Sequence, residues 1–127
     1  MSDALIVYET IAREAGTIDQ KIAVSRLILT RAKLGLRYKW GTTPRSVCLY
    51  PGAFDCWNSQ THASQDERTQ EELEQAMKAF EIACTTKSDF PATHYHDKRQ
   101  EKHTGIFKDM KFLCTVDKDM HFYQEIR

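Results

Sequence analysis

The sequence has no long hydrophobic run and no excess of charge of either sign. Its 127 residues include 18 basic and 18 acidic side chains, which cancel, whereas nucleic-acid-binding proteins more often carry a basic excess. No stretch approaches the roughly 18 apolar residues that a membrane-spanning helix requires. Internal repeats and low-complexity tracts are also missing. We therefore expect one globular domain over residues 1–127, monomeric, without a membrane span and without a nucleic-acid partner.

The cysteines lack the close spacing of a metal site. Cys48, Cys56, Cys84 and Cys114 form no CxxC pair, and the five histidines add no short ligand pair beside them. Such pairs normally nucleate a zinc site. We expect free, partly buried thiols, no metal and no cofactor. A zinc protein built on Cys and His is the less favoured alternative, and metal analysis would test it.

The N-terminus lacks the pattern of a signal peptide. It has no basic leader, and its apolar run is interrupted by Glu9, Arg13 and Glu14. A secretory signal needs an uninterrupted apolar segment of about 7–15 residues. We expect a protein made in the cytoplasm, which would need another route to any target outside it.

Helical periodicity dominates the first 34 residues of the chain. Ser2 can cap a first helix that ends at Gly16, for which we expect a left-handed stop. Thr17 and Gln20 form a capping box for a second helix, which runs to about Leu34 and is apolar over most of its circumference. Such a helix is expected at the centre of the fold.

A loop and a third helix are expected next. Residues 35–64 carry the glycine and proline punctuation of a loop, together with large aromatic side chains. Ser64 and Glu67 resemble a capping box for a third helix. Its apolar stripe consists of Leu73, Ala76, Met77, Phe80 and Ala83.

The last third favours strands. Residues 92–96, 110–116 and 120–126 are short segments rich in aromatic or β-branched side chains, as strands are. The expected fold class is therefore α+β: N-terminal helices, a third helix and a small C-terminal antiparallel sheet.

Five blocks in this order resemble one family. They are Glu14-Ala15, IAVSRLILTR (22–31), LYPGAFDCW (49–57), ATHYH (92–96) and HFY (121–123). The chain is similar to the SleB-type cell-wall hydrolases, meaning the spore-cortex-lytic enzymes and their phage relatives. Thr30 stands where that family has Asn. The resemblance implies a lysozyme-like domain that cleaves peptidoglycan glycan strands, with Glu14 as the catalytic acid.

Glu14 also suits that chemistry on physical grounds. Glycosidic cleavage needs a carboxylic acid that protonates the leaving oxygen, and burial beside an apolar helix favours the protonated form. The alternative is a solvated helix residue paired with Arg13 or Lys21. Glu9, on a different face of the helix, is the reserve candidate.

A second carboxylate is harder to find. Asp19 is better explained as a first-turn helix acid, and Asp55 lies where the resemblance implies no acid. Without a second carboxylate, the 6-hydroxyl of the sugar can attack, which makes a lytic transglycosylase. We favour this reaction over that of a two-carboxylate muramidase.

Aromatic and polar side chains in the later blocks are candidates for sugar contacts, because sugars present apolar faces edged with hydroxyls. They are Tyr50, Phe54, Trp57, His94 and Tyr95. Phe54 and Trp57 are as well explained as plugs that hold the loop onto the helices.

The expected biological role is that of a phage endolysin or virion-associated lysin. A leaderless enzyme of this kind can wait in the host cytoplasm for a membrane pore, or travel in the virion, before it reaches the cell wall. The alternative is a non-catalytic peptidoglycan-binding or structural virion protein with the same fold.

Overall fold

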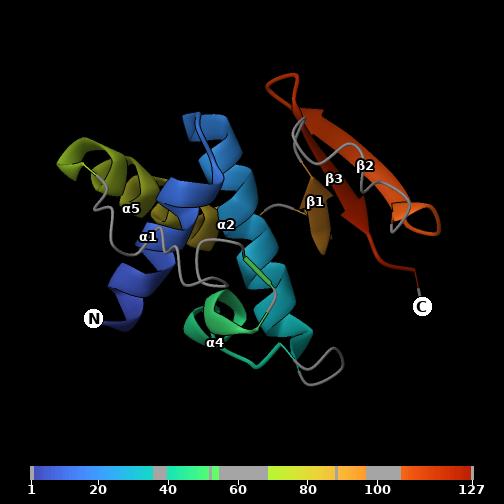
Figure 1. Ribbon diagram of the computed structural model, residues 1–127, viewed down its shortest axis with the longest axis horizontal. Helices are drawn as coiled ribbons and strands as arrows, with labels where there is room; N and C mark the ends of the chain where they lie inside the picture. The colour runs from blue at the N-terminus through green and yellow to red at the C-terminus, as the bar shows by residue number, and fades with distance from the viewer. Residues whose placement is uncertain are drawn as a thin grey trace.

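The computed structural model describes residues 2–35, 40–51, 53–54, 69–87, 89–96 and 107–126. These residues form four helices followed by a three-stranded antiparallel sheet (Figure 1). The elements are α1 (Asp3–Glu14), α2 (Ile18–Lys33), α4 (Pro44–Leu49), α5 (Gln70–Thr85), β1 (His94–His96), β2 (Lys111–Val116) and β3 (Met120–Gln124). The α+β class expected from the sequence is confirmed.

The caps of α1 and α2 follow the sequence signals, with one exception. The Ser2 hydroxyl accepts the backbone N–H of Leu5, and Thr17 and Gln20 form the expected capping box. The left-handed stop at Gly16 is wrong, because among the described glycines only Gly41 has a positive φ. The chain leaves α1 in an extended conformation, and the Gln20 side chain accepts the Gly16 N–H at 3.1 Å.

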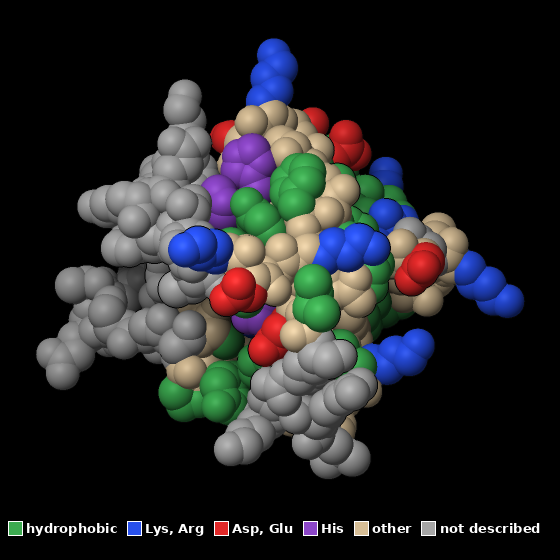
Figure 2. Space-filling model, turned by 90° about the vertical axis from the view of Figure 1, so that its right-hand side faces the viewer, with side chains coloured by type: hydrophobic (Ala, Val, Ile, Leu, Met, Phe, Trp, Pro, Cys, Tyr) green, Lys and Arg blue, Asp and Glu red, His purple; other side chains and the backbone are tan. Residues whose placement is uncertain are grey.

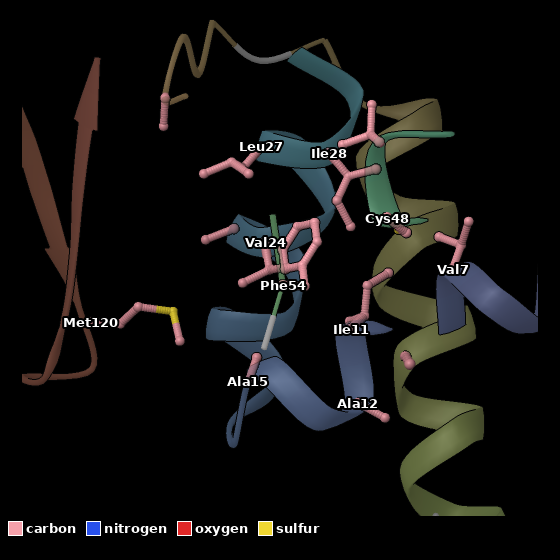
Figure 3. Close-up of a cluster of buried hydrophobic side chains, with 14 of the residues drawn as sticks. Val7, Ile11, Ala12, Ala15, Val24, Leu27, Ile28, Cys48, Phe54 and Met120 are labelled. Atoms are coloured by element: carbon pink, nitrogen blue, oxygen red, sulfur yellow. The ribbon is translucent and has the colours of Figure 1, made fainter. Parts of the chain in front are cut away.

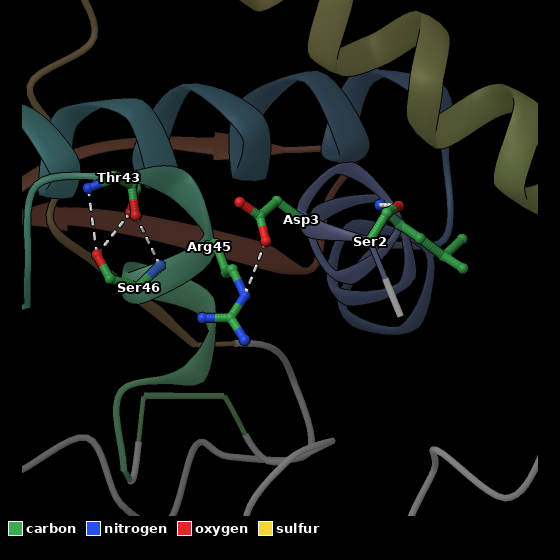
Figure 4. A network of polar contacts seen from close by, with 6 residues as sticks. Ser2, Asp3, Thr43, Arg45 and Ser46 are labelled. Carbon is green, nitrogen blue, oxygen red and sulfur yellow. Dashed lines mark hydrogen bonds and ion pairs between the residues drawn. The ribbon is translucent and has the colours of Figure 1, made fainter.

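Helix α4 was not expected, since residues 35–64 were read as loop. Thr43 and Ser46 form a reciprocal capping box, and Pro44 occupies the first turn (Figure 4). Arg45 of this helix pairs with Asp3 of α1 at 3.0 Å. Six residues are too few to show a helical apolar period, so the loop punctuation dominated the prediction.

Helix α5 begins later than the sequence suggested. Its N-cap is Thr69, whose hydroxyl accepts the Glu72 N–H at 3.1 Å; Ser64 and Glu67 lie outside the described residues. The apolar stripe also differs in one member, because Met77 is 47% exposed.

Helix α2 occupies the centre, as expected. It packs against α1, α4, α5 and β2, and its residues Val24, Leu27 and Ile28 are fully buried. Figure 3 shows these side chains beside Ile11 of α1, with Met120 of β3 on the sheet side. Within the described ranges, no helix combines the length and apolarity needed to cross a membrane.

The strand order is β1-β3-β2, and the register separates the two faces of the sheet. Tyr95 pairs with Phe122, whereas His94 pairs with Tyr123 and His96 with His121. Since side chains alternate along a strand, Tyr95 and Phe122 share one face and the histidines and Tyr123 share the other. Phe122 is fully buried, so its face is the one that packs on the helices.

The hairpin between β2 and β3 is tied to the start of α2. Asp117 and Lys118 adopt positive φ in its turn, at 52° and 74°. The Thr17 hydroxyl donates to the Asp117 carboxylate, and the Gln20 amide donates to Asp119 Oδ1 at 2.6 Å. The two cap residues of α2 therefore also anchor the sheet.

Candidate functional site

Glu14 and Tyr95, both singled out from the sequence, meet where α1 faces the sheet. Glu14 is the last residue of α1 and is partly buried. The Tyr95 hydroxyl donates a hydrogen bond to Glu14 Oε1, across 81 residues of sequence. The Tyr95 ring packs on Phe122, with ring centroids 5.5 Å apart. The buried face of β1 therefore sets the position of the phenol, and the phenol orients the carboxyl group.

Arg31 is the buried cation of this site. It is 6% exposed, and its Nε donates to the Thr93 carbonyl oxygen at 2.8 Å. Its guanidinium lies over two rings, 4.8 Å from the centroid of Trp40 and 5.4 Å from that of Phe54. Such stacking suits a planar and weakly hydrated guanidinium.

The charges around Arg31 include Glu14. Burial lowers the pKa of Arg31 to about 10, and attraction by Tyr95, Cys48, Glu14 and Glu125 opposes this shift. Its Nη1 is buried and has no hydrogen-bond partner among the described residues. The guanidinium is thus held within electrostatic range of the candidate acid.

Two glycines bring the loop close to Arg31. A Cβ on Gly35 would lie 1.5 Å from the Gly41 carbonyl oxygen, and Gly41 itself has a φ of 86°. Both positions therefore exclude a side chain. The close approach places Trp40, next to Gly41, over the end of α2.

Cys48 of α4 belongs to the same buried region but is not reactive. Burial raises the pKa of its thiol to about 12, although a hydrogen bond with Thr10 and the charge of Arg31 act in the opposite direction. A thiol that stays protonated is a poor nucleophile. Cys84 and Cys114 are also free thiols; Cys114 is partly buried, as expected, whereas Cys84 is exposed. Cys56 lies outside the described residues.

His94 lies on the other face of the sheet from Tyr95. Its Nδ1 is 2.9 Å from Thr93 Oγ1, and its ring is edge-on to Trp40. Burial, assisted by Arg31, lowers its pKa to about 4. The imidazole is therefore neutral at neutral pH, which suits a hydrogen-bonding role better than proton donation.

Rings and histidines continue along this outer face. His96 stacks on Tyr123, and His96 Nε2 is 3.0 Å from the Tyr123 hydroxyl. Figure 2, which views the molecule from the side of the sheet, shows histidine beside hydrophobic side chains.

The remaining expected sugar contacts fall in three different settings. Tyr50, at the C-cap of α4, is 37% exposed. Phe54 is 1% exposed beneath Arg31, which leaves no surface for a sugar and matches the plug alternative. Trp57 lies outside the described residues.

The other acids considered from the sequence are also placed. Glu9 is buried and accepts from Arg13 Nε at 3.0 Å. Asp19 is exposed in the first turn of α2, as a helix acid would be. Asp55 lies outside the described residues.

Sequence reasoning missed Arg31 and Glu125. Arg31 ends the block IAVSRLILTR, but nothing in its spacing distinguishes it from an ordinary C-terminal helix cation. Glu125 follows β3 and acts electrostatically on both Arg31 and His94. No group of His, Cys, Asp and Glu in the described part of the chain could hold a metal ion.

Comparisons of the chain with protein-family models, curated proteins and solved structures found no match. The likeness to SleB-type hydrolases therefore rests on the five sequence blocks. Two of them, Glu14-Ala15 and ATHYH, are joined by the hydrogen bond between Glu14 and Tyr95.

Proposed function

We propose that this chain cleaves peptidoglycan glycan strands between N-acetylmuramic acid and N-acetylglucosamine, as a single-glutamate lytic transglycosylase that a phage uses to lyse its host. The observation that carries the proposal is the hydrogen bond from Tyr95 to Glu14. It joins two sequence blocks that the resemblance assigns to the active site. A fold that merely buried these residues would not require the phenol to meet the carboxyl group.

The proposed reaction uses Glu14 twice. As a carboxylic acid it gives its proton to the glycosidic oxygen, and the bond from that oxygen to the anomeric carbon of the muramic acid breaks. The 6-hydroxyl oxygen of the same sugar then bonds to the anomeric carbon, and its proton returns to the Glu14 carboxylate. The product is an anhydro sugar, and no water is consumed.

Two neighbours of Glu14 favour its carboxylate form, which the second step needs. Donation from the Tyr95 hydroxyl and attraction by Arg31 both stabilise the carboxylate relative to the carboxylic acid. This carboxylate is the base that accepts the proton of the 6-hydroxyl. Burial and the C-terminal end of α1 favour the protonated acid, which the first step needs.

A two-carboxylate muramidase is the alternative reaction, and Glu125 is the observation in its favour. Glu125 and Glu14 both act on the Arg31 guanidinium. Mass spectrometry of the released muropeptides separates the reactions, because anhydro and reducing ends differ by one water. Anhydro ends are expected; reducing ends would favour the muramidase.

The acid is tested by Glu14→Gln in a lysis assay on purified sacculi. Loss of a general acid lowers the rate by roughly 100-fold or more, whereas binding to sacculi should persist. The matched control is Glu81→Gln, the same chemical change at an exposed position of α5. If Glu14→Gln lyses as fast as the control, the assignment is wrong; if the wild type binds sacculi without lysis, the protein is a non-catalytic binder.

A further inference from the structure

A cavity of about 470 Å³ lies on the side of α2 that carries Arg26, Thr30 and Lys33. The strand side of the lining includes Asp89, which precedes β1, and Glu125, which follows β3. Its apolar lining includes Leu29, Leu34 and Phe90. The volume lies within the range of about 300–1,000 Å³ that is typical of small-ligand sites.

Three charged side chains of this cavity, those of Arg26, Lys33 and Asp89, have no charged partner among the described residues. Arg26 donates from Nη2 to the Thr86 hydroxyl at 3.2 Å, but its Nε is buried and has no hydrogen-bond partner among the described residues. Over the same ranges, Arg26, Lys33 and Asp89 form no ion pair. A buried guanidinium nitrogen without a partner costs free energy unless a ligand or water occupies it.

We propose that this cavity binds a short zwitterionic peptide. Its carboxylate would meet Arg26 and Lys33 on α2, and its ammonium group would meet Asp89 and Glu125 beside the strands. The apolar lining accommodates a small side chain such as that of alanine. A simple anion would face two carboxylates here, and a simple cation would face two basic groups, so a ligand with both charges fits best.

The peptide source rests on the proposed function: the stem peptide of peptidoglycan carries carboxylates and amines on a short chain attached to the muramic acid. The cavity is connected to the candidate acid through Thr93 and Arg31. Thr93 lines it, and the Thr93 carbonyl accepts from Arg31, which in turn acts on Glu14. A glycan strand at Glu14 could therefore place its peptide in this cavity.

Binding is tested by titrating the sugar-free tripeptide N-acetyl-L-Ala-γ-D-Glu-L-Lys into the purified chain, followed by calorimetry and NMR. The acetyl group stands in for the amide that joins the stem peptide to the muramic acid, so the only ammonium is that of the lysine. The wild type should bind, and Arg26→Gln and Asp89→Asn should each weaken binding at least about tenfold, because each removes one charge partner. Lys78→Gln, an exposed change on α5, and Glu14→Gln should bind as the wild type does. Equal binding by all variants, or no binding by the wild type, would overturn the proposal.

Inorganic phosphate tests the simpler ligand class. If phosphate binds with the same dependence on Arg26 and with no dependence on Asp89, and displaces the peptide, the cavity is an anion site and the proposal is wrong. Should Arg26→Gln fail to fold by circular dichroism, Lys33→Gln replaces it, because Lys33 is exposed and makes no ion pair.

Cleavage assays separate this inference from the proposed function. Arg26→Gln should cleave intact strands more slowly and amidase-treated, peptide-free strands at the wild-type rate. Equal slowing on both substrates would overturn the peptide site and leave glycan cleavage intact. If the wild type cleaves neither substrate, glycan cleavage is wrong, and the titration alone decides whether the cavity takes the peptide.

Discussion

The helical part and the sheet of this protein are held together by different kinds of side chain. The centre of the helical part is aliphatic, with Ile11, Val24 and Leu27 fully buried, and its helix ends are satisfied by side chains three or four residues away. In the sheet, rings pack on rings, as His96 and Phe107 do on Tyr123. Helices close their hydrogen bonds locally, whereas strands obtain partners only through distant pairing.

The candidate site lies on the boundary between these two parts. Glu14 belongs to the helices, Tyr95 to the sheet, and Arg31 reaches from α2 to the carbonyl of Thr93. The site can therefore form only if the sheet docks correctly on α2. The predictions below test the contacts at this boundary.

The largest expected loss of stability comes from removing an aromatic side chain of the sheet that packs at the boundary. Phe122→Ala removes a fully buried ring that packs on Phe90 and Tyr95, so the free energy of unfolding should fall by about 3–5 kcal/mol. Phe112→Ala is the matched control, because Phe112 is 54% exposed on the same sheet. Urea unfolding is followed by far-UV circular dichroism and tryptophan fluorescence. Two separate transitions, with only the sheet affected, would show that the parts fold independently.

The second largest loss of stability is expected from the hydrogen bonds between α2 and the β2–β3 hairpin. Gln20→Ala removes the side-chain bonds to the Gly16 N–H, the Val116 carbonyl and Asp119, and should cost about 2 kcal/mol of unfolding free energy. Gln70→Ala, which breaks an exposed pair with Glu74 on α5, should cost less than about 0.5 kcal/mol. Equal costs for the two variants would mean that the hairpin contacts contribute nothing.

Tyr95→Phe tests, through the rate of lysis, whether the contact between sheet and helices positions Glu14. The ring keeps its packing, but the carboxyl group of Glu14 loses the donor that orients it, so the lysis rate should fall roughly tenfold, or about 1.4 kcal/mol. Tyr123→Phe removes a similar hydroxyl from the outer face, where it meets His96, and should lyse as the wild type does. A Tyr95→Phe rate equal to that of Tyr123→Phe would argue against the positioning role.

The last effect is a pH dependence of stability, similar in size to the effect of Tyr95→Phe on lysis. The pKa of His94 is about 4 in the folded chain, against an ordinary value of 6.5. The unfolded chain therefore binds this proton more readily between pH 6.5 and 4, and stability should fall as the pH drops through that range, by roughly 1–2 kcal/mol after solvent screening. Urea midpoints of the wild type and His94→Gln at pH 4.5 and 7 measure the difference. If His94→Gln loses as much stability between pH 7 and 4.5 as the wild type does, another group causes the pH dependence.

Much of the helical part could be predicted because its signals are local. The caps at Ser2 and Thr17 and the apolar pattern of α2 are readable within a few residues. Helix α4 was missed because its six residues span fewer than two helical turns, too few for an apolar period to repeat. The left-handed stop at Gly16 was wrong because the Gln20 side chain, and not a backbone turn, satisfies its N–H.

The strands were also found, but their register was not. Alternation indicated that His94 and Tyr95 point to opposite faces, yet only the pairing of Tyr95 with Phe122 shows which face meets the helices. The same holds for Phe54, for which groove and plug were equally good readings until its burial under Arg31 was known.

By itself, the sequence determined the α+β class and the central place of α2, and it made Glu14 the leading candidate for a catalytic acid, which stays a prediction. The tertiary structure alone decided that Tyr95 meets Glu14, that the buried Arg31 packs against two rings and that opposite charges line one cavity. The reason is physical. Helix periods and caps depend on neighbours three or four residues apart, whereas a site at the joint of helices and sheet depends on pairings 60–80 residues away, which no local pattern encodes.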